Sequence, residues 1–288
     1  MKRGRKAQSA LHFSRMPARL FFPVLLALLM GQSACHEKPK PVAPPPLKLE
    51  TRRFERSLPG CGDKSKREEP CVTFRIEWPE IVEAAAAGEK AAEAKARMNA
   101  AILARLQPAE APKGFEAEAA QVIADYERFR DQFPASSVNY FTRRVAEAAL
   151  VGRSLLSVRI TAEEYRGGAH PEATREYLNL SPATGERVEL PSLTRGGGME
   201  RLAAIAERHF RAERGLEADQ DLKRAGFTFE GNRFALPAQW GAEARGLVFH
   251  FNAYEVAPYA AGPTTFTVPW SELGDILRKD SGLPPATR

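Results

Sequence analysis

Residues that could do chemistry gather in one short stretch, Glu164 to Pro171, which reads EYRGGAHP. His170 could act as a general base or bind a metal ion, because a neutral imidazole does both. The two glycines instead favour a tight turn at the end of a strand, where a positive φ is needed. A catalytic loop, a metal site and a simple turn are therefore three readings of this stretch, and the rest of the chain has to decide between them.

Other candidate groups give little support to catalysis. Three further histidines lie downstream of residue 34, namely His36, His209 and His250. Their spacing matches no metal-ligand pattern, and no phosphate-binding loop, GxSxG elbow or HExxH motif occurs. Glu163 and Glu164 are neighbours in a predicted strand and must point to opposite faces, while Asp219 and Asp221 lie in a charged, exposed segment. We therefore expect no catalytic residue, no metal and no cofactor. A zinc site formed by scattered histidines, and an enzyme in which His170 acts with a serine or a nearby carboxylate, stay open as alternatives.

The net charge of +6 is concentrated at the N-terminus. Residues 1–34 hold six Lys and Arg and no acidic residue, so the rest of the chain is formally neutral. A neutral domain lacks the electrostatic footprint of a nucleic-acid binder, and we expect no nucleic-acid partner.

The same N-terminus has the features of a removable export signal. An apolar run, Leu20 to Met30, is too short to span a bilayer but suits a secretory signal. The sequence GQSAC that follows resembles a bacterial lipobox, although Gln32 stands where Leu, Val or Ile is usual. We expect a lipoprotein signal peptide over 1–34 and acylation (palmitate) of Cys35; ordinary cleavage near Ala34 is the alternative. His36, in place of Asp, favours the outer membrane of the bacterial envelope and a periplasm-facing domain.

A proline-rich linker over 35–48 would connect the lipid-anchored Cys35 to a folded domain over 49–288. Near the start of that domain, Cys61 and Cys71 should form a disulfide, because an exported chain meets an oxidising compartment. No CxxC motif accompanies them, so a metal site is disfavoured.

The periodicity of the domain predicts an α+β fold: an antiparallel β-sheet with helices packed on one face. Apolar stripes predict helices over 89–106 and 115–133, in the N-terminal half (49–150), and a third over 199–214, in the C-terminal half (151–288). We interpret the stripe of the second helix as core packing and not as a partner-binding face. Alternation predicts strands over 72–78, on both sides of Gly152, over 173–180 and twice within 246–270. A hairpin around Gly231 and Asn232 and a short helix over 271–278, capped by Ser271, complete the prediction.

Three segments in this order, EYRGGAHP, YLNLSPATGERVELPSL and GLVFHFNAYEVAPYAAGPTTFTVPW, resemble the RsiV/PdaC-like domain family. This domain forms the extracellular part of lysozyme-sensing anti-sigma factors and precedes the catalytic domain of some peptidoglycan deacetylases. The resemblance covers about residues 70–280. The matching residues are Tyr165, Gly167, Gly168, Ala169, His170, Asn179, Thr184, Gly185, Tyr254, Pro258, Tyr259 and Gly262. Pro171 is a departure, since the family usually has glycine there.

The resemblance implies a binding module and not an enzyme, since neither a sigma-binding segment with a spanning helix nor a deacetylase domain is recognised in the chain. The implied partner is peptidoglycan or a lysozyme-like protein. Ligand-binding candidates are Tyr165, Gly167, Gly168, His170, Tyr254, Pro258, Tyr259 and Gly262, with the loop from Tyr254 to Pro263 as an exposed contact surface. A wall-glycan hydrolase or deacetylase-like enzyme using His170, and a structural scaffold of an envelope complex, are the alternatives.

Overall fold

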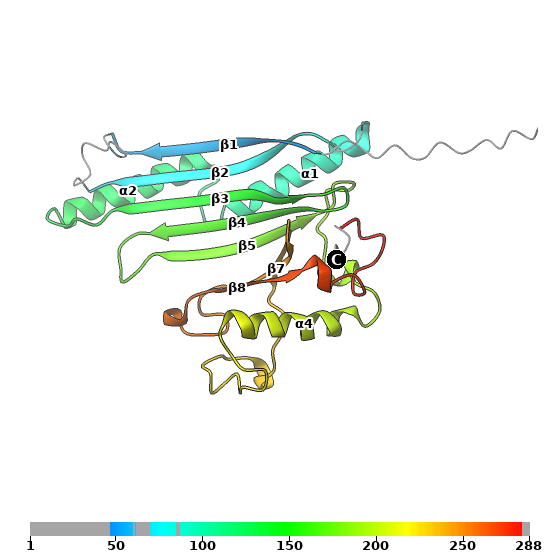
Figure 1. The fold of residues 1–288 in the computed structure, drawn as a ribbon. Coiled ribbons are helices and arrows are strands. Elements are labelled where there is room, and N and C mark those ends of the chain that lie inside the picture. Colours follow the sequence, from blue (N-terminus) through cyan, green and yellow to red (C-terminus); the bar gives the residue numbers. More distant parts are fainter. Residues whose placement is uncertain (1–46, 60, 62–69, 85–86, 284–288) are drawn as a thin grey trace, which may run out of the picture. The chain divides into compact units, whose positions relative to one another are not determined.

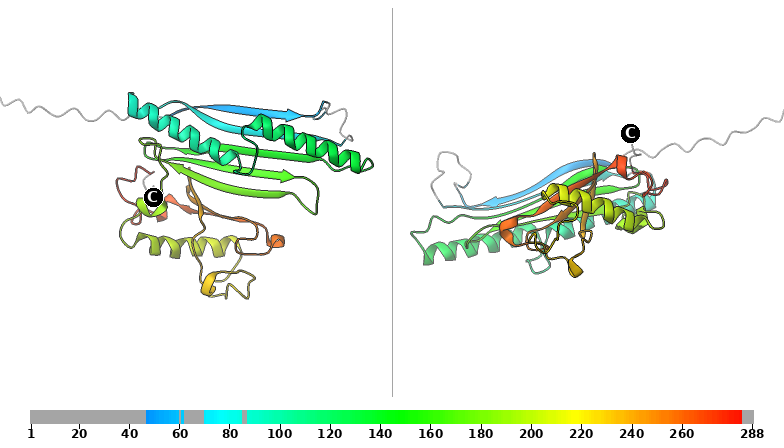
Figure 2. Two further views of the ribbon diagram at one scale, coloured as in Figure 1. Left: turned by 180° about the vertical axis from the view of Figure 1, so that it is seen from behind. Right: turned by 60° about the horizontal axis from the view of Figure 1, so that its bottom comes forward.

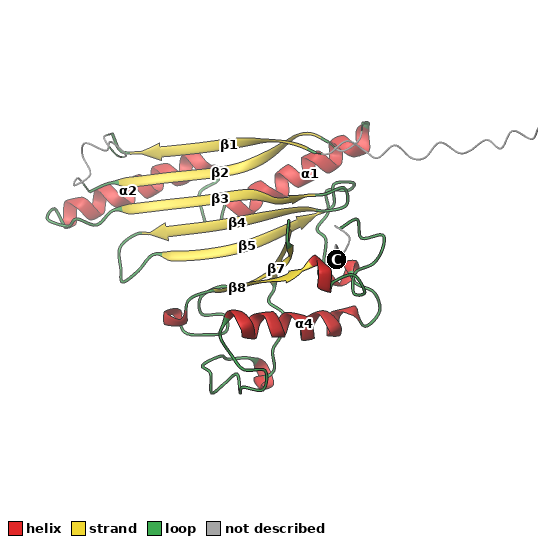
Figure 3. Ribbon diagram, viewed as in Figure 1, coloured by secondary structure: helices red, strands yellow, loops and turns green. Residues whose placement is uncertain are grey.

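The computed structural model describes residues 47–59, 61, 70–84 and 87–283, which form two sheets and their helices (Figures 1 and 3). The first sheet contains β1 (Lys48–Ser57), β2 (Val72–Glu83), β3 (Tyr140–Val151), β4 (Leu156–Tyr165) and β5 (Glu172–Leu180), with α1 (Glu89–Leu106) and α2 (Phe115–Gln132). The second contains β6 (Gln239–Glu243), β7 (Gly246–Phe251) and β8 (Thr264–Pro269), with α3 (Leu190–Leu193) and α4 (Gly198–Glu213). Single 3₁₀ turns lie at Glu230–Asn232, Tyr259–Ala261 and Trp270–Glu272. The expected signal peptide, Cys35 and the linker up to residue 46 lie outside the described residues.

The five strands of the first sheet lie in chain order, and every neighbouring pair is antiparallel except β2 and β3. A parallel pair needs a crossover connection, and α1 and α2 provide it. Both helices therefore cover one face of this sheet, as the left view of Figure 2 shows. Val72, Phe74 and Ile76 alternate toward that face and are fully buried against the helices. No helix within the described ranges has both the length and the apolar character needed to cross a bilayer.

Pro79 marks the point where β2 and β3 part. Their parallel ladder ends at Glu77 and Val145, two residues before the proline, which has no N–H to donate. Beyond it, the side chain of Asn99 on α1 replaces the missing strand. The Asn99 amide accepts a hydrogen bond from Ile81 N (2.8 Å) and donates one to Ile81 O (3.0 Å). Ile81 therefore has partners for its backbone N–H and C=O although the ladder to β3 has ended.

The second sheet has the order β6-β7-β8, is antiparallel throughout, and carries α4 against β8. Its core is rich in aromatic rings that surround the buried Phe210 of α4, among them Phe227, Phe251 and Phe266. A separate core lies between the first sheet and the helices α1 and α2. The described residues thus build two cores, each a sheet with helices on one side.

Strand β6 joins the two sheets through polar contacts with β4 and β5. Ala242 N donates to the buried hydroxyl of Ser157 (3.0 Å), and the side chain of Asn179 donates to Trp240 O (2.8 Å). Gly241 allows this close approach, because a Cβ there would lie 2.0 Å from the ring of Tyr177. The matched residue Asn179 therefore has a structural role at this junction.

The outer edge of β5 has no strand beside it and is closed by two amide side chains. Asn252, just after β7, accepts from Arg175 N (2.7 Å) and donates to Arg175 O (3.0 Å). Gln239 accepts from Tyr177 N (3.1 Å). These bonds fix the segment after β7 beside β5, and so determine where the loop between β7 and β8 begins.

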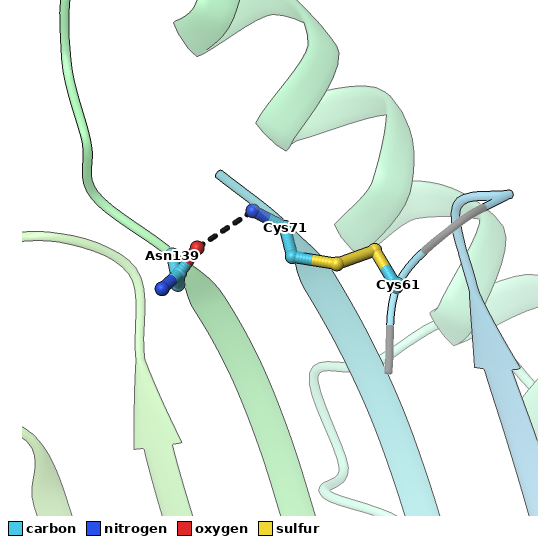
Figure 4. Close-up of a disulfide and its surroundings, with 3 residues drawn as sticks. All are labelled: Cys61, Cys71 and Asn139. Carbon is cyan, nitrogen blue, oxygen red and sulfur yellow. Dashed lines mark hydrogen bonds between the residues drawn. A yellow bond between two sulfur atoms is a disulfide. The ribbon is translucent and has the colours of Figure 1, made fainter. Parts of the chain in front are cut away.

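The expected disulfide between Cys61 and Cys71 is present, with a Cα–Cα distance of 5.6 Å (Figure 4). It connects the segment after β1 to the residue before β2. Asn139, just before β3, accepts a hydrogen bond from Cys71 N (2.6 Å), and Cys71 O accepts one from Tyr140 N (2.9 Å). The disulfide is thus tied to the start of β3.

The α+β class and the three long helices are confirmed, with helix boundaries within a residue or two of those expected. Three details of the prediction are wrong. The sheet is not purely antiparallel, because β2 and β3 run in the same direction. The segment around Gly231 and Asn232 is a 3₁₀ turn without flanking strands, since its phenylalanines pack around Phe210 instead of pairing. Residues 271–278 form turns after a 3₁₀ start, not a helix.

The prediction also missed β1, which begins at Lys48, within the last residue of the expected linker. Leu47 before it is buried in the core of the first sheet.

Candidate functional site

The stretch EYRGGAHP ends β4, turns and leads into β5. Gly167 and Gly168 adopt φ values of 89° and 109°, which only glycine adopts readily, and this confirms the turn expected from the two glycines. The Tyr165 hydroxyl donates to Gly168 O (2.8 Å) and closes the turn. Nδ1 of the exposed His170 lies 3.0 Å from Pro171 O. This contact holds the imidazole against the backbone just before β5.

The loop between β7 and β8 is built on a turn held by Asn252 and Glu255. Asn252 N donates to the Glu255 carboxylate (3.0 Å), and Glu255 N donates to Asn252 O (3.2 Å). Within that turn Tyr254 has a φ of 69°, in the left-handed region that bulky residues avoid at a cost of about 1–3 kcal/mol. Pro258 precedes a 3₁₀ turn that starts at Tyr259, and Gly262 (φ 70°) ends it. The loop therefore holds Tyr254 in a conformation that its own backbone preference opposes.

The two loops meet through aromatic rings. The rings of His170 and Tyr259 stack at 3.8 Å with an interplanar angle of 13°, and the Tyr259 hydroxyl donates to Pro171 O (3.4 Å). Tyr254 lies 5.4 Å from Tyr259 and is 66% exposed, while Tyr259 is 38% exposed. We call Tyr254, Tyr259 and His170 the aromatic cluster. Residues from two distant parts of the chain thus form one surface that is open to solvent.

All eight sequence-predicted binding residues belong to this cluster or to the turns that carry it. Gly167 and Gly168 shape the first loop, and Pro258 and Gly262 bound the turn that carries Tyr259. Tyr165 differs, because its ring packs toward Phe141 (6.3 Å between centroids) and only its hydroxyl serves the turn. Tyr165 is therefore a support for the loop and not part of the exposed aromatic surface.

The aromatic cluster offers groups suited to non-covalent binding. Among the described residues, no hydrogen bond or ion pair links His170 to a carboxylate or a hydroxyl nucleophile. Its ring face is occupied by Tyr259, and Nδ1 is directed at a backbone carbonyl. The aromatic rings can contact an apolar surface of a ligand, and the tyrosine hydroxyls can form hydrogen bonds at its edge.

The other two histidines in the described ranges, His209 and His250, form contacts elsewhere. His209 Nε2 lies 2.9 Å from a Glu272 carboxylate oxygen, and His250 lies opposite Thr265 on β8 with Nδ1 2.7 Å from its hydroxyl. In the described ranges no three His, Cys, Asp or Glu side chains come close enough to hold a metal ion. Glu163 and Glu164 point to opposite faces, as expected, with Arg143 and Arg166 as their respective partners.

His250 lies at the base of the β7–β8 loop. Its other nitrogen, Nε2, lies 3.3 Å from the side-chain oxygen of Asn252, and Arg175 donates to the Thr265 hydroxyl (3.1 Å). Burial and then the positive charge of Arg175 lower the pKa of His250 to about 4. A neutral imidazole with its proton on Nε2 satisfies both contacts, so His250 supports the loop as an uncharged group.

Sequence reasoning missed two features around the site. Asn252 links the β7–β8 loop to β5, and the only local signal was its place after a strand, where Asn often begins a turn. Arg144 forms a buried ion pair with Glu118 on the helix-covered face of the sheet. The sequence could have indicated this ion pair, because Arg144 alternates with Thr142 and Ala146 on the buried face of β3.

Residues 192–271 match the profile of a family described as "Protein of unknown function (DUF3298)". The matched range contains the β7–β8 loop with Tyr254 and Tyr259, but not the β4–β5 turn with His170. Among curated proteins, none shows significant sequence similarity to the chain.

Two solved structures of DUF3298 family members share the fold. One, from Bacteroides fragilis, has a TM-score of 0.61 and 19% identity, covering 83% of this chain and 96% of that one. The other, from Pseudomonas aeruginosa, has a TM-score of 0.56 and 17% identity, covering 83% and 97%. At these identities the likeness concerns the fold alone.

Proposed function

We propose that this chain is a non-enzymatic lipoprotein of the bacterial cell envelope whose folded domain binds a wall-related ligand through the aromatic cluster. The resemblance to the RsiV/PdaC-like domain supplies two candidate ligands, peptidoglycan and a lysozyme-type muramidase. The observation that carries the proposal is the convergence of His170, Tyr254 and Tyr259 from two loops onto one exposed surface.

Two physical arguments support a binding role for this surface. Tyrosine covers much area with few rotatable bonds, so it loses little entropy when it is immobilised in an interface, and it is enriched among residues that dominate binding energy. In addition, the backbone strain at Tyr254 is maintained while its ring stays exposed, so the strain is not compensated by burial of the ring. The stacked ring of His170 supports a role in shaping the surface over a role as general base.

A membrane tether through acylated Cys35 completes the proposal. It rests on the basic start, the apolar run Leu20 to Met30 and the lipobox-like GQSAC. A lipoprotein cysteine carries more than one lipid chain, and this is needed for stable attachment, since one chain alone binds the membrane only marginally. Mass spectrometry of the N-terminal peptide from envelope membranes tests this part: acylated Cys35 supports it, and an unmodified N-terminus downstream of residue 35 contradicts it.

The binding proposal is tested with the full chain purified in detergent. Its affinity for isolated sacculi and for a lysozyme-type muramidase is measured in parallel for the parent protein, Tyr254→Ala and Tyr259→Ala. Phe133→Ala is the matched control, because Phe133 is 55% exposed at the end of α2 and packs on Phe129, outside the aromatic cluster.

We expect the parent protein to bind one of the two ligands, and each tyrosine variant to bind it about tenfold or more weakly. Phe133→Ala should bind like the parent. Binding to neither ligand, or equal losses in the tyrosine variants and in the control, contradicts the proposal.

A further inference from the structure

A pocket of about 310 Å³ lies between the α1–α2 loop and the helix-covered face of the first sheet. Pro108, Glu110, Ala111 and Pro112 of the loop and Glu118, Gln121 and Val122 of α2 line one part of it. Arg144 of β3, Glu164 of β4 and Arg166 of the β4–β5 turn line the rest. We call this the loop pocket. It is large enough for a small molecule such as an amino acid or a dipeptide.

Arg144, which lines the loop pocket, is held in a buried ion pair. Arg144 donates to both oxygens of Glu118 (2.7 and 3.0 Å) and to Leu106 O at the end of α1 (3.0 Å). The side chains of Arg144 and Glu118 are 8% and 5% exposed. Because their charges compensate each other, the pair contributes little net charge to the pocket, and its geometry is rigid.

Glu164 and Arg166 each have side-chain atoms that form no close contact and can bind a ligand. One oxygen of Glu164 lies 2.6 Å from Arg166 Nε, while the other lies 3.8 Å from Arg144 Nη2, beyond hydrogen-bond distance. Arg166 reaches Asp125 only at 3.7 Å. Both side chains are about one-third exposed, so a ligand in the pocket can reach a free carboxylate oxygen and a free guanidinium edge.

A polar atom beside the pocket also lacks a partner. Thr142 pairs directly with Glu164 across the strands and precedes Arg144 on the same face of β3. It is 1% exposed, and its hydroxyl oxygen has no hydrogen-bond partner among the described residues. Buried hydroxyls are normally paired, so this part of the face has unused hydrogen-bonding capacity.

We propose that the loop pocket binds a small zwitterionic ligand of the amino acid or dipeptide class, with its ammonium group on Glu164 and its carboxylate on Arg166. A simple anion would meet the carboxylates of Glu110, Glu118 and Glu164, and a simple cation would meet the guanidinium groups of Arg144 and Arg166. A neutral ligand would remove Glu164 and Arg166 from water without offering an opposite charge, which is costly. A zwitterion presents both charges at once.

This site is distinct from the aromatic cluster and does not depend on the proposed function. The two are nevertheless close along the chain, because Arg166 immediately precedes Gly167 in the turn that carries His170. A ligand that holds Arg166 would therefore hold one end of the turn on which the aromatic cluster is built.

Calorimetric titration of the full chain in detergent tests the proposal with four probes: alanyl-alanine, its N-acetylated form, its C-terminal amide and glucose. N-acetylation removes the ammonium charge, and amidation removes the carboxylate. The variants are Glu164→Gln and Arg166→Gln, with Glu163→Gln as the matched control. Glu163 is the adjacent residue of β4, lies on the opposite face and is paired with Arg143 (3.2 Å).

We expect saturable binding of alanyl-alanine, and about tenfold or more weaker binding of either singly charged probe and of glucose, because each lost charge-assisted hydrogen bond is worth about a factor of ten. Glu164→Gln and Arg166→Gln should weaken binding of the dipeptide by a similar factor, and Glu163→Gln should leave it unchanged. No saturable binding of the dipeptide, equal binding of a singly charged probe or of glucose, or an equal loss in Glu163→Gln overturns the proposal. Because Arg166 is partly exposed, its variant tests the site even where Glu164→Gln disturbs the sheet.

Discussion

Acidification should destabilise the protein through one buried group, His250. The native state holds this imidazole neutral, with a pKa of about 4, whereas the unfolded chain has an ordinary value near 6.5. Below pH 6.5 the unfolded state therefore binds a proton that the native state does not, and stability falls as the pH falls toward 4. The two pKa values differ by about 2.5 units, which corresponds to a maximum change of about 3 kcal/mol in the free energy of unfolding. Between pH 7 and pH 4.5 the loss from this residue is about 2.4 kcal/mol.

The assay is urea unfolding of the full chain at a series of pH values from 7 to 4.5, compared with His250→Gln. Glutamine does not titrate, and it keeps a donor for Asn252 and an acceptor for Thr265. Because carboxylates also titrate in this range, the informative quantity is the difference in pH dependence between the two proteins. We expect the parent to lose about 2 kcal/mol more than the variant.

The control is Phe133→Ala, a non-titrating position that is 55% exposed. The pH dependence of its stability should match that of the parent. Equal pH dependence in the parent and His250→Gln would refute the reasoning, because the buried imidazole would then not be the group that couples protonation to folding.

Three further predictions concern stability, and urea unfolding measures each of them. Gly241→Ala should cost about 1–3 kcal/mol, because its Cβ would overlap the ring of Tyr177; an unchanged midpoint would contradict the close contact. Glu118→Ala should cost about 3–5 kcal/mol by leaving Arg144 buried without a partner, while replacing both by apolar residues of similar volume should cost much less. Cys61→Ser should cost about 2–3 kcal/mol under oxidising conditions and nothing in the presence of a reductant; a loss in both would show that the bond itself is not responsible.

The three long helices could be predicted because their burial is local in sequence. Ala94, Met98, Ile102 and Leu106 recur every four residues and are all buried in α1. Strand β1 could not be found in this way. Its ten residues, KLETRRFERS, are mostly charged and exposed, and it stands at the edge of the sheet. Its place depends on pairing with β2, which no local pattern encodes.

The parallel pairing of β2 with β3 escaped prediction for a related reason. Strand direction follows from the crossover path of α1 and α2, and sequence alternation is the same in both directions. The chain does turn at Gly231 and Asn232, with positive φ values at both residues, but the expected hairpin does not form. The flanking phenylalanines gain more by packing around Phe210 than by pairing with each other.

The members of the aromatic cluster were identified through the family resemblance, and not through spacing or periodicity. Nothing in the local sequence indicates that His170 and Tyr259 stack, because the contact joins two loops that are distant in the chain. The loop pocket was missed altogether. Its charged residues come from the α1–α2 loop, α2, β3, β4 and the β4–β5 turn, so only the folded chain brings them together.

The amide groups that close the outer edge of β5 also limit how the protein can associate. An unpaired strand edge invites another chain to extend the sheet, in aggregates as well as in specific complexes. Asn252 and Gln239 already occupy three of the backbone groups that such a strand would use, Arg175 N, Arg175 O and Tyr177 N. At these positions a partner strand meets side-chain amides in place of free backbone groups. Asn252→Ala should leave Arg175 N and O free to pair with another chain, so we expect soluble oligomers in light scattering. A variant that stays as monodisperse as the parent would contradict this.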